Sequence, residues 1–440
     1  MSDTQHPSQP KLERTLGPLM LWGLGVGYVI SGMYFGWNLG LREGGTLGLA
    51  IATGFIVVMY LCFTFSYTEL ACAIPKAGGA FDYADRALGH NWGFVAGWAQ
   101  IIEFVFAPPA IAAAIGAYFG LLTGGDATLI GLMAYVLFTA LNILGVKAAA
   151  TFELVITILA VAELLLFSGL TLPHFEVANL SANALPNGYA GIFAAVPFAI
   201  WFFLAIEGVA NVAEETVNPQ RNVLIGFGSA ILTLVVLCIL TFVSSVGVAG
   251  WEAIVFNADG TASDSPLPLA LSHIVGDSGL MYHLLVSIGL LGLVASFHGI
   301  ILAAGRATFE FGRVGMAPTL LGKVHPRFHT PANALIANML VGMLALMTGK
   351  TGDIITIACF GAITLYIISM VSLIRLRDAE PDMHRPFKVP FYPLSPMLAL
   401  GIAAVALLSM AWFNHRIALI YAGLLAASYL GYLVVYRKKG

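Results

Sequence analysis

Charged residues are scarce in this sequence. Asp, Glu, Lys and Arg make up 10% of its 440 residues, whereas a soluble domain carries about 25%. Hydrophobic residues make up 59%, and the mean hydropathy is +0.89. A chain of this composition lacks the polar residues to cover a soluble surface, so we expect it to lie in the lipid bilayer. The net charge of -3 carries no information on nucleic acid, but no basic patch is present, and we expect no nucleic-acid partner.

Cysteine is also rare. The four cysteines, all in apolar segments, are Cys62, Cys72, Cys238 and Cys359. They lack metal-ligand spacing, and no two lie in a loop where a disulfide could be argued. We therefore interpret them as small apolar packing residues. No nucleophile–base arrangement or metal cluster lies in the apolar segments, so the sequence predicts neither an enzyme, nor a cofactor, nor a metal site.

Long apolar runs dominate the chain instead. Runs of about 20 residues, the length that crosses a bilayer, occur at twelve places. They span 16–40, 45–72, 92–121, 127–145, 151–172, 191–214, 223–248, 282–306, 332–349, 354–374, 396–413 and 417–435. The sequence thus predicts an all-α polytopic membrane protein with 12 transmembrane helices and both termini on one side. Seventeen of the 20 Lys and Arg fall on that side, which predicts cytoplasmic tails at 1–15 and 437–440.

Two of the predicted helices carry signs of an interruption. The first run contains five glycines, at Gly23, Gly25, Gly27, Gly32 and Gly36, too many for a regular helix. The sixth run holds Glu207 followed by Gly208 about 15 residues into an apolar stretch. Interruptions in corresponding positions, five helices apart, point to an inverted repeat with substrate at mid-membrane. Close helix packing is the competing interpretation of the glycines.

Glu103 lies about 16 Å along its helix from the boundary residue Trp92, at the ordinary helical rise. Trp98, Phe104 and Phe106 surround it in the sequence. An acid among aromatic rings suits a small organic cation, through charge pairing and cation–π attraction. A proton-carrying or purely structural buried acid is the alternative. Unpaired acids are costly at this depth, so we favour the cation site.

Glu207 and His298 are candidates for coupling or gating. Glu207 either exchanges a proton or links the first and sixth helices through hydrogen bonds. His298 lies at mid-depth in the eighth run, where it is either satisfied by a backbone or hydroxyl partner or acts as a proton switch. Glu153, near the inner face, is interpreted as packing or snorkelling toward the interface.

Several motifs resemble one family, the amino acid–polyamine–organocation superfamily of secondary transporters. They occur in the same order along nearly the whole chain: SGMYF (31–35), YTELACAIPKAGGAFDY (67–83), FVAGW (94–98), FLAIEGVANVAEETVNPQRN (203–222), AAGRATFEFGRVGMAP (303–318), VHPRFHTPANA (324–334) and RPFKVPFYPLSP (385–396). The resemblance implies a leucine-transporter-like 5+5 inverted repeat with discontinuous helices 1 and 6. The repeats would be 16–172 and 191–376, followed by two extra helices at 396–436.

The same resemblance implies the site. Substrate would contact the interrupted first helix at Ser31, Gly32 and Met33, and the interrupted sixth helix. In the sixth helix the implied residues are Trp201, Phe202, Phe203, Leu204 and Ala205, with the carbonyls of 204–206 accepting from the substrate. Trp201 occupies the position of a gating aromatic.

Two departures from the family pattern bear on the substrate and the coupling ion. Ile30 replaces the first glycine of the carboxylate-binding motif, which suggests a substrate without a carboxylate. The stretches around Glu103 and Glu207 look most like the bacterial ethanolamine permeases, and this implies ethanolamine import across a bacterial inner membrane. An amino acid or polyamine permease or exchanger is the alternative. Ala160 stands where some members of the family carry a lysine. Sodium is disfavoured as the coupling ion, while proton symport, exchange and facilitated uptake all stay open as modes of transport.

Overall fold

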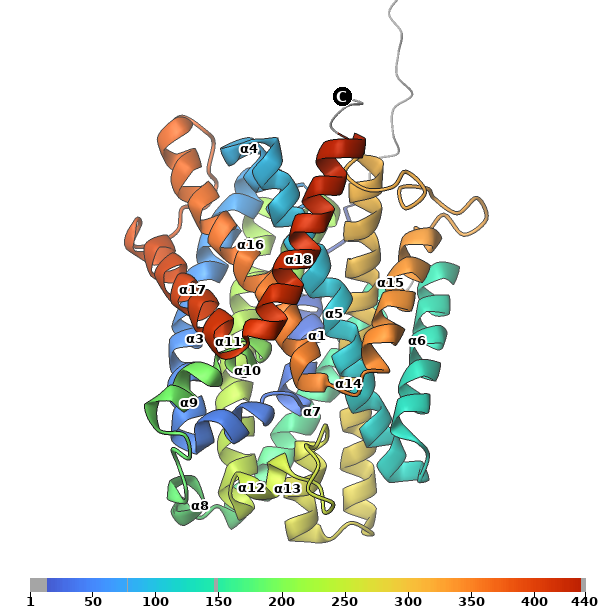
Figure 1. The fold of residues 1–440 in the computed structure, drawn as a ribbon, viewed down its shortest axis with the longest axis vertical. Coiled ribbons are helices and arrows are strands. Elements are labelled where there is room, and N and C mark those ends of the chain that lie inside the picture. Colours follow the sequence, from blue (N-terminus) through green and yellow to red (C-terminus); the bar gives the residue numbers. More distant parts are fainter. Residues whose placement is uncertain (1–13, 77, 146–148, 437–440) are drawn as a thin grey trace, which may run out of the picture.

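Helices account for the regular structure of the residues that the computed structural model describes, which are 14–76, 78–145 and 149–436. In these ranges the only β pairings are two isolated bridges, Leu16 with Thr216 and Phe256 with Ala262. The helices run along one long direction and form an elongated bundle (Figure 1). The predicted tail 437–440, and all of the predicted tail 1–15 except Arg14 and Thr15, lie outside the described residues.

Nine helices of the described chain are long and apolar enough to cross a membrane. They are α3 (Leu39–Ala73), α5 (His90–Thr123), α6 (Ala127–Leu144), α7 (Ala149–Thr171), α11 (Pro219–Ala249), α14 (Leu280–Arg313), α16 (Thr351–Ala379), α17 (Leu394–Phe413) and α18 (His415–Gly431). A helix satisfies most of its backbone hydrogen bonds internally, as the bilayer interior requires. The predicted class, an all-α polytopic membrane protein, is confirmed.

The other three predicted spans are built from shorter pieces. The first is α1 (Pro18–Val29) with α2 (Ser31–Tyr34). The sixth is α9 (Gly188–Ala194), α10 (Val196–Trp201) and the 3-10 helix η2 (Ile206–Glu215). The ninth is the single helix α15 (Ala332–Leu346). Connecting helices are α4 (Ala80–Leu88), η1 (Leu172–His174), α8 (Val177–Ser181), α12 (Glu252–Val255), α13 (Pro266–Val275) and the π-helical η3 (Tyr432–Tyr436).

The first span is interrupted later than the sequence suggested. Ile30 is helical, at φ -59° and ψ -24°, and its N–H donates to the Val26 carbonyl at 2.8 Å. Ser31 to Tyr34 therefore form a helical turn, and the expectation of an unwound segment at Ser31–Met33 is wrong. The chain leaves the helix at Phe35, and Gly36 takes a positive φ of 87°. A side chain at Gly36 would collide with the Trp201 indole, so only glycine fits there.

The sixth span is interrupted where expected. α10 ends at Trp201, a turn follows, and η2 continues as a 3-10 helix to Glu215. The residue at the interruption is Ala205, with φ 73° and ψ 10°. A non-glycine residue in this left-handed region costs about 1–2 kcal/mol. The strain therefore lies at Ala205, three residues before the glycine that the sequence pointed to.

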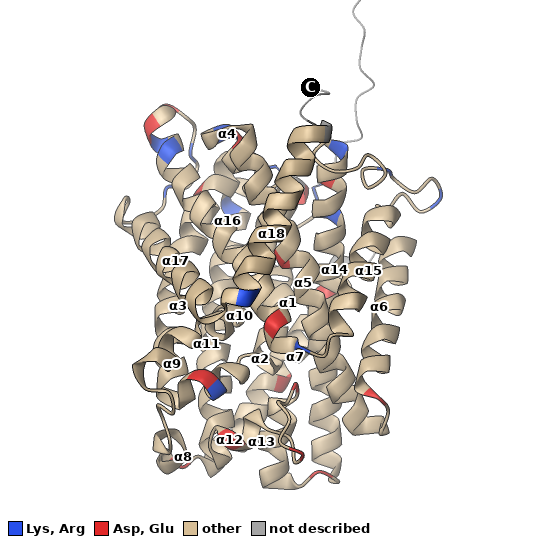
Figure 2. Ribbon diagram, in the orientation of Figure 1, with Lys and Arg blue, Asp and Glu red and all other residues tan. Residues whose placement is uncertain are grey.

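The bundle has a buried centre and an exposed flank. α5 packs against α14 and α16, and α1 packs against α7, α11 and α14. α17 and α18 cover one side of this core (Figure 1). Lys and Arg gather mainly at the end that carries α4 (Figure 2), here named the α4 end; the other is the α12–α13 end. This asymmetry matches the charge distribution that predicted two different membrane faces.

Candidate functional site

Glu103 lies at the centre of the bundle, on α5. Its side chain is fully buried, at 0% exposure, and its Oε1 accepts a hydrogen bond from the Ala205 N–H at 3.1 Å. The left-handed conformation of Ala205 interrupts the helix, and its N–H donates to α5 rather than within the span. The predicted site acid and the interrupted sixth span are thus in direct contact.

Glu207 lies beside Glu103 and is also fully buried. The two carboxyl groups are close neighbours in the buried centre. Glu207 Oε2 also accepts from the Tyr366 hydroxyl at 2.8 Å, and Tyr366 in turn contacts the Tyr60 hydroxyl at 3.2 Å. Glu103 Oε2 and Glu207 Oε1 meet no donor among the described residues.

One of the three expected carbonyl ligands of the sixth span, that of Ala205, already accepts a hydrogen bond, and so does the nearby Trp201 carbonyl. The Ala205 carbonyl accepts from the Gly208 N–H at 3.1 Å, and the Trp201 carbonyl accepts from the Leu204 N–H at 3.4 Å. Leu204 itself is buried, at 4% exposure. The break therefore presents an N–H to Glu103 rather than free carbonyls to a ligand at these two positions.

Aromatic residues close the bundle between this centre and the α12–α13 end. The Trp201 Nε1–H donates to the Phe35 carbonyl at 3.0 Å, and the two rings meet edge-on with centroids 5.4 Å apart. Trp37 stacks on Phe202 at 5.4 Å, while Phe203 contacts Tyr60 at 5.2 Å. All of these side chains are at most 2% exposed, so they form a tightly packed aromatic layer.

The predicted residues of the first span lie against this aromatic layer. A Cβ at Gly32 would lie 2.6 Å from the Trp201 carbonyl oxygen, so α2 touches the sixth span directly. The Ser31 hydroxyl pairs with the Ser296 hydroxyl of α14 at 2.8 Å, and the Met33 carbonyl accepts from Trp37 Nε1 at 3.1 Å. Nothing in the sequence had indicated that Ser296 contacts the first span, because the two serines lie on helices far apart in the chain.

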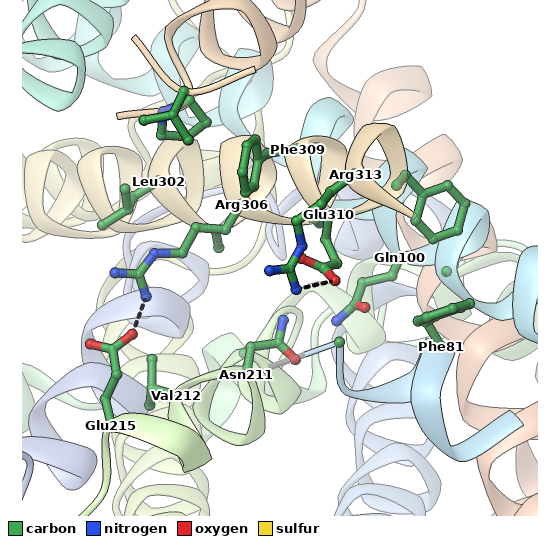
Figure 3. Close-up of a pocket in the computed structure, with 18 of the residues that line it drawn as sticks. Phe81, Gln100, Asn211, Val212, Glu215, Leu302, Arg306, Phe309, Glu310 and Arg313 are labelled. Atoms are coloured by element: carbon green, nitrogen blue, oxygen red, sulfur yellow. Dashed lines mark hydrogen bonds and ion pairs between the residues drawn. The ribbon is translucent and has the colours of Figure 1, made fainter. Parts of the chain in front are cut away.

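On the other side of the centre lies a cavity of about 570 Å³. Two ion pairs line it, Arg306 with Glu215 at 3.1 Å and Arg313 with Glu310 at 2.7 Å (Figure 3). The arginine side chains are 47% and 48% exposed, so the cavity reaches the surface at the α4 end. We name this cavity the vestibule.

Tyr28 closes the inner end of the vestibule. Its ring is wedged between two glycines: a Cβ at Gly208 would lie 2.9 Å from the ring, and one at Gly299 would lie 2.7 Å from it. Gly208 directly follows Glu207 and also lines the vestibule, so the ring lies close to the carboxyl pair. Gly208 of the sixth span and Gly299 of α14 thus allow close packing around one aromatic ring.

His298 belongs to a different cluster. Its Nδ1 lies 3.9 Å from Glu153 Oε2, and both side chains are buried, at 6% and 3% exposure. A Cβ at Gly27 would lie 2.6 Å from the Glu153 carboxylate, so the pair faces α1. Of the two interpretations of Glu153, snorkelling is wrong and packing agrees with the structure, because helix α7 carries the side chain into the bundle rather than toward the interface. A partner 145 positions away in the chain left no local signal.

A multi-pass bundle in which two interrupted helices meet at buried acids is the architecture of a secondary transporter. The model of the amino acid permease family matches residues 19–436, and the chain belongs to this family of transporters. An uncharacterized transporter of Rhizobium meliloti is 28% identical over 418 residues, covering 92% of this chain and 88% of the relative.

Two relatives from Bacillus subtilis have names that state a substrate. A methylthioribose transporter is 27% identical over 433 residues, covering 92% of this chain and 89% of its own length. A branched-chain amino acid permease is 26% identical over 432 residues, covering 92% and 90%. The family is thus shown, while the relation to ethanolamine permeases rests on the sequence resemblance alone.

Proposed function

We propose that this protein is a secondary transporter of a small amino-bearing solute, in the first place an amino acid, working by alternating access in a bacterial inner membrane. The observation that carries the proposal is the contact between Glu103 and the interrupted sixth span at Ala205. The family and the name of the branched-chain amino acid permease favour an amino acid over other solutes.

The α4 end is assigned to the cytoplasm, because most Lys and Arg lie on that side (Figure 2). With this orientation the conformation is closed toward the outside by the Trp201 and Phe202 contacts, and open toward the cytoplasm through the vestibule. Trp201 then acts as the outer gate and Tyr28 as the inner barrier. In transport the two would open in alternation, which exposes Glu103 to one side at a time.

Glu103 is assigned the substrate ammonium. The ammonium would bind Glu103 Oε2, which meets no donor among the described residues, and leave the Ala205 N–H contact in place. Glu207 would take part as the coupling group, since it lies beside Glu103 and accepts a hydrogen bond from the Tyr366 hydroxyl. This assignment makes protons the coupling ion, with the proton count set by how the pair changes on substrate binding.

Ethanolamine is the second candidate substrate, favoured by one specific observation. The N–H of Ile30 is bonded to the Val26 carbonyl and cannot bind a carboxylate, and the side chain fills the place of a glycine. A cation without a carboxylate needs only Glu103. A polyamine is a weaker alternative, because the described centre holds two acids at one place rather than at two separated places.

Thermal stabilisation of the purified protein tests the proposal, since a ligand of the native state raises apparent stability by mass action. Serine, alanine, ethanolamine, choline and putrescine are compared on the wild type and on Glu103→Gln, with Glu252→Gln in the outer loop as the matched control. Amino-bearing solutes are expected to stabilise the wild type and the control but not Glu103→Gln. Equal stabilisation of Glu103→Gln would refute the assignment of the ammonium.

A further inference from the structure

Glu153 and His298 form a buried ionisable pair that the proposed function does not use. They are 3% and 6% exposed, and they lie on α7 and α14, two helices long and apolar enough to cross the membrane. Glu153 Oε2 lies 3.9 Å from His298 Nδ1, an ion-pair distance that is too long for a hydrogen bond. Glu153 Oε1 meets no donor among the described residues. Ionisable side chains inside membrane spans are costly, so such a pair calls for a functional role.

The pair lies directly behind Tyr28, the inner barrier. A Cβ at Gly299 would lie 2.7 Å from the Tyr28 ring and 3.4 Å from Glu153 Oε1, so ring and carboxylate adjoin the same glycine. A Cβ at Gly27 would lie 2.6 Å from the same carboxylate oxygen. The Ser296 hydroxyl of α14 also donates to the Tyr28 carbonyl at 2.6 Å. α1 therefore cannot move away from α7 and α14 without changing the surroundings of Glu153.

No other charge balances the pair: in the described part of the chain, Glu153 and His298 are each other's only ion-pair partner. From α6, the Phe138 ring meets the imidazole edge-on, and the Asn142 side chain donates to the His298 carbonyl at 3.4 Å. From α1, the titratable group that faces the pair is Tyr28. The charged groups nearest along the two helices are paired elsewhere: Glu163 of α7 accepts from Tyr34, and Arg306 of α14 pairs with Glu215.

One proton decides the charge of this pair. With His298 protonated and Glu153 ionised, the two charges cancel, and the pair is also neutral when the proton lies on Glu153 instead. Loss of this proton to water leaves a carboxylate beside a neutral imidazole, which is one net negative charge. A buried charge without a partner is unfavourable, so loss of the proton destabilises any conformation in which the pair is buried.

We propose that Glu153 and His298 form a proton-binding site, separate from Glu103 and Glu207, whose protonation favours the outward-closed conformation of this structure. The site takes one proton from water and returns it to water when α1 moves away from α7 and α14. The proposal rests on the proposed function for alternating access. It adds a proton to any that Glu207 exchanges, and it places this proton next to the inner barrier rather than at the substrate.

The test measures outer closure at several pH values without any substrate. Cys359 reports on it, because it is fully buried and its thiol donates to the Pro197 carbonyl of α10 at 3.2 Å. In a protein whose other three cysteines are alanine, labelling by a membrane-impermeant thiol reagent is measured from about pH 5 to about pH 8, the range in which histidine titrates. The reference is Glu153→Gln/His298→Gln, in which the pair carries no charge at any pH.

The ratio of the two labelling rates removes the pH dependence of the thiol and of Glu103 and Glu207, which both proteins share. This ratio is expected to rise about tenfold with pH, since a proton affinity that differs tenfold between two conformations shifts their populations by up to that factor. A ratio that stays constant across the range overturns the proposal.

Two further variants keep the test decisive. Glu153→Gln alone is expected to lose the rise, because no carboxylate is left unpaired when His298 is neutral; it also replaces the reference if the double variant does not fold. Glu163→Gln is the matched control, since it changes another buried acid of the same helix, 5% exposed, and it is expected to keep the rise. A rise that persists in Glu153→Gln overturns the proposal, and so does its loss in Glu163→Gln together with Glu153→Gln.

Uptake of alanine into proteoliposomes separates this proposal from the proposed function. An inward proton gradient is expected to accelerate uptake by the wild type more than uptake by Glu153→Gln/His298→Gln. Equal acceleration in both proteins overturns a role of the pair in coupling. A wild type that neither binds nor takes up any of the amino-bearing solutes refutes the proposed function instead, while the labelling of Cys359 still decides on the proton site.

Discussion

At the scale of single residues, Glu103 decides what the centre of the bundle can hold. Glu103→Gln keeps an acceptor for the Ala205 N–H and keeps the volume, so the fold is expected to persist. The amide removes the negative charge that would pair with an ammonium, and losing a buried charge pair costs about 2–5 kcal/mol. Uptake into proteoliposomes is therefore expected to fall roughly 30-fold or more. Uptake at the wild-type rate would contradict the role of Glu103.

Tyr28 gives a second prediction at this scale. In Gly299→Ala the new methyl carbon would lie 2.7 Å from the Tyr28 ring, so the ring or α14 must shift. Overpacking of this kind costs about 1–3 kcal/mol, and the variant is expected to unfold at a lower temperature than the wild type. Gly423→Ala is the matched control, because nothing lies within 4 Å of a Cβ there and the residue is inside α18. This control is expected to leave the unfolding temperature unchanged or to raise it. An equal fall of the unfolding temperature in both variants would contradict the tight packing of the Tyr28 ring against Gly299.

At the scale of elements, Ala205 holds the interrupted sixth span in a strained conformation. Ala205→Gly removes the steric strain at φ 73° but adds freedom to the unfolded chain, so a gain of up to about 1 kcal/mol is expected. Ala205→Val places a β-branched residue in the same region and is expected to lower stability by more than that. Thermal unfolding measures both. A Val variant as stable as the Gly variant would show that the turn relaxes to another conformation.

Asp264 joins the outer loop to α16, and this contact predicts a pH dependence. Its Oδ2 accepts from the Thr351 hydroxyl at 2.9 Å, and burial raises the pKa of Asp264 from 3.8 to about 6. The neutral form is favoured in the folded state, so its contribution to stability is complete below about pH 4 and is lost as the pH rises through about 6.

Asp264→Asn keeps an acceptor for Thr351 and carries no charge at any pH. The melting temperature of the variant is expected to exceed that of the wild type increasingly from pH 5 to pH 7, and the difference is then expected to level off. Asp259→Asn is the control, because Asp259 is exposed and hydrogen bonds from Thr261 lower its pKa below 3.8. A constant difference between Asp264→Asn and the wild type across this range would show that the carboxyl is ionised throughout.

The elements also show where sequence reasoning stops. The apolar runs predicted the spans, because length and hydropathy are properties of each segment alone. The glycine-rich first run indicated the first interrupted span. Which of its glycines turns the chain is decided by the contact of Gly36 with the Trp201 indole, and the sequence does not show this contact. Glu103 was found from depth and aromatic neighbours, whereas its proximity to Glu207 and the Glu153–His298 pair depend on helices far apart in sequence.

At the scale of the whole molecule, we propose that residues 16–172 and 191–376 act as two repeats that move against each other. Residues 396–436 take no part in this movement. Two interrupted spans lie side by side where such repeats would meet: the Thr15 and Leu16 N–H groups both donate to the Glu215 carbonyl, at 2.9 and 3.0 Å. The Phe35 carbonyl accepts from Trp201 at the outer side of the same junction. One junction thus carries a contact on each side of the site.

The outer contact gives a prediction for the whole conformational equilibrium. Trp201→Phe removes the N–H that donates to the Phe35 carbonyl and reduces the buried ring, so it destabilises the outward-closed state. Cys359 reports on this side, because it is fully buried and its thiol donates to the Pro197 carbonyl of α10 at 3.2 Å. The experiment uses a protein in which the other three cysteines are replaced by alanine. There, Trp201→Phe is expected to speed labelling of Cys359 by a membrane-impermeant thiol reagent about tenfold. The reason is that the loss of one hydrogen bond of about 1.4 kcal/mol shifts a two-state population by that factor.

The matched control is Trp412→Phe, which changes the same side chain at an exposed position on α17 (79% exposed) and leaves the junction intact. Labelling of Cys359 in this control is expected to stay slow, since nothing in the outer closure has changed. An amino-bearing solute that binds the inward-open state would slow labelling of Trp201→Phe by the factor that it shifts the equilibrium. Equal labelling rates in the wild type and Trp201→Phe would place the outer closure elsewhere, in the stacking of Trp37 on Phe202.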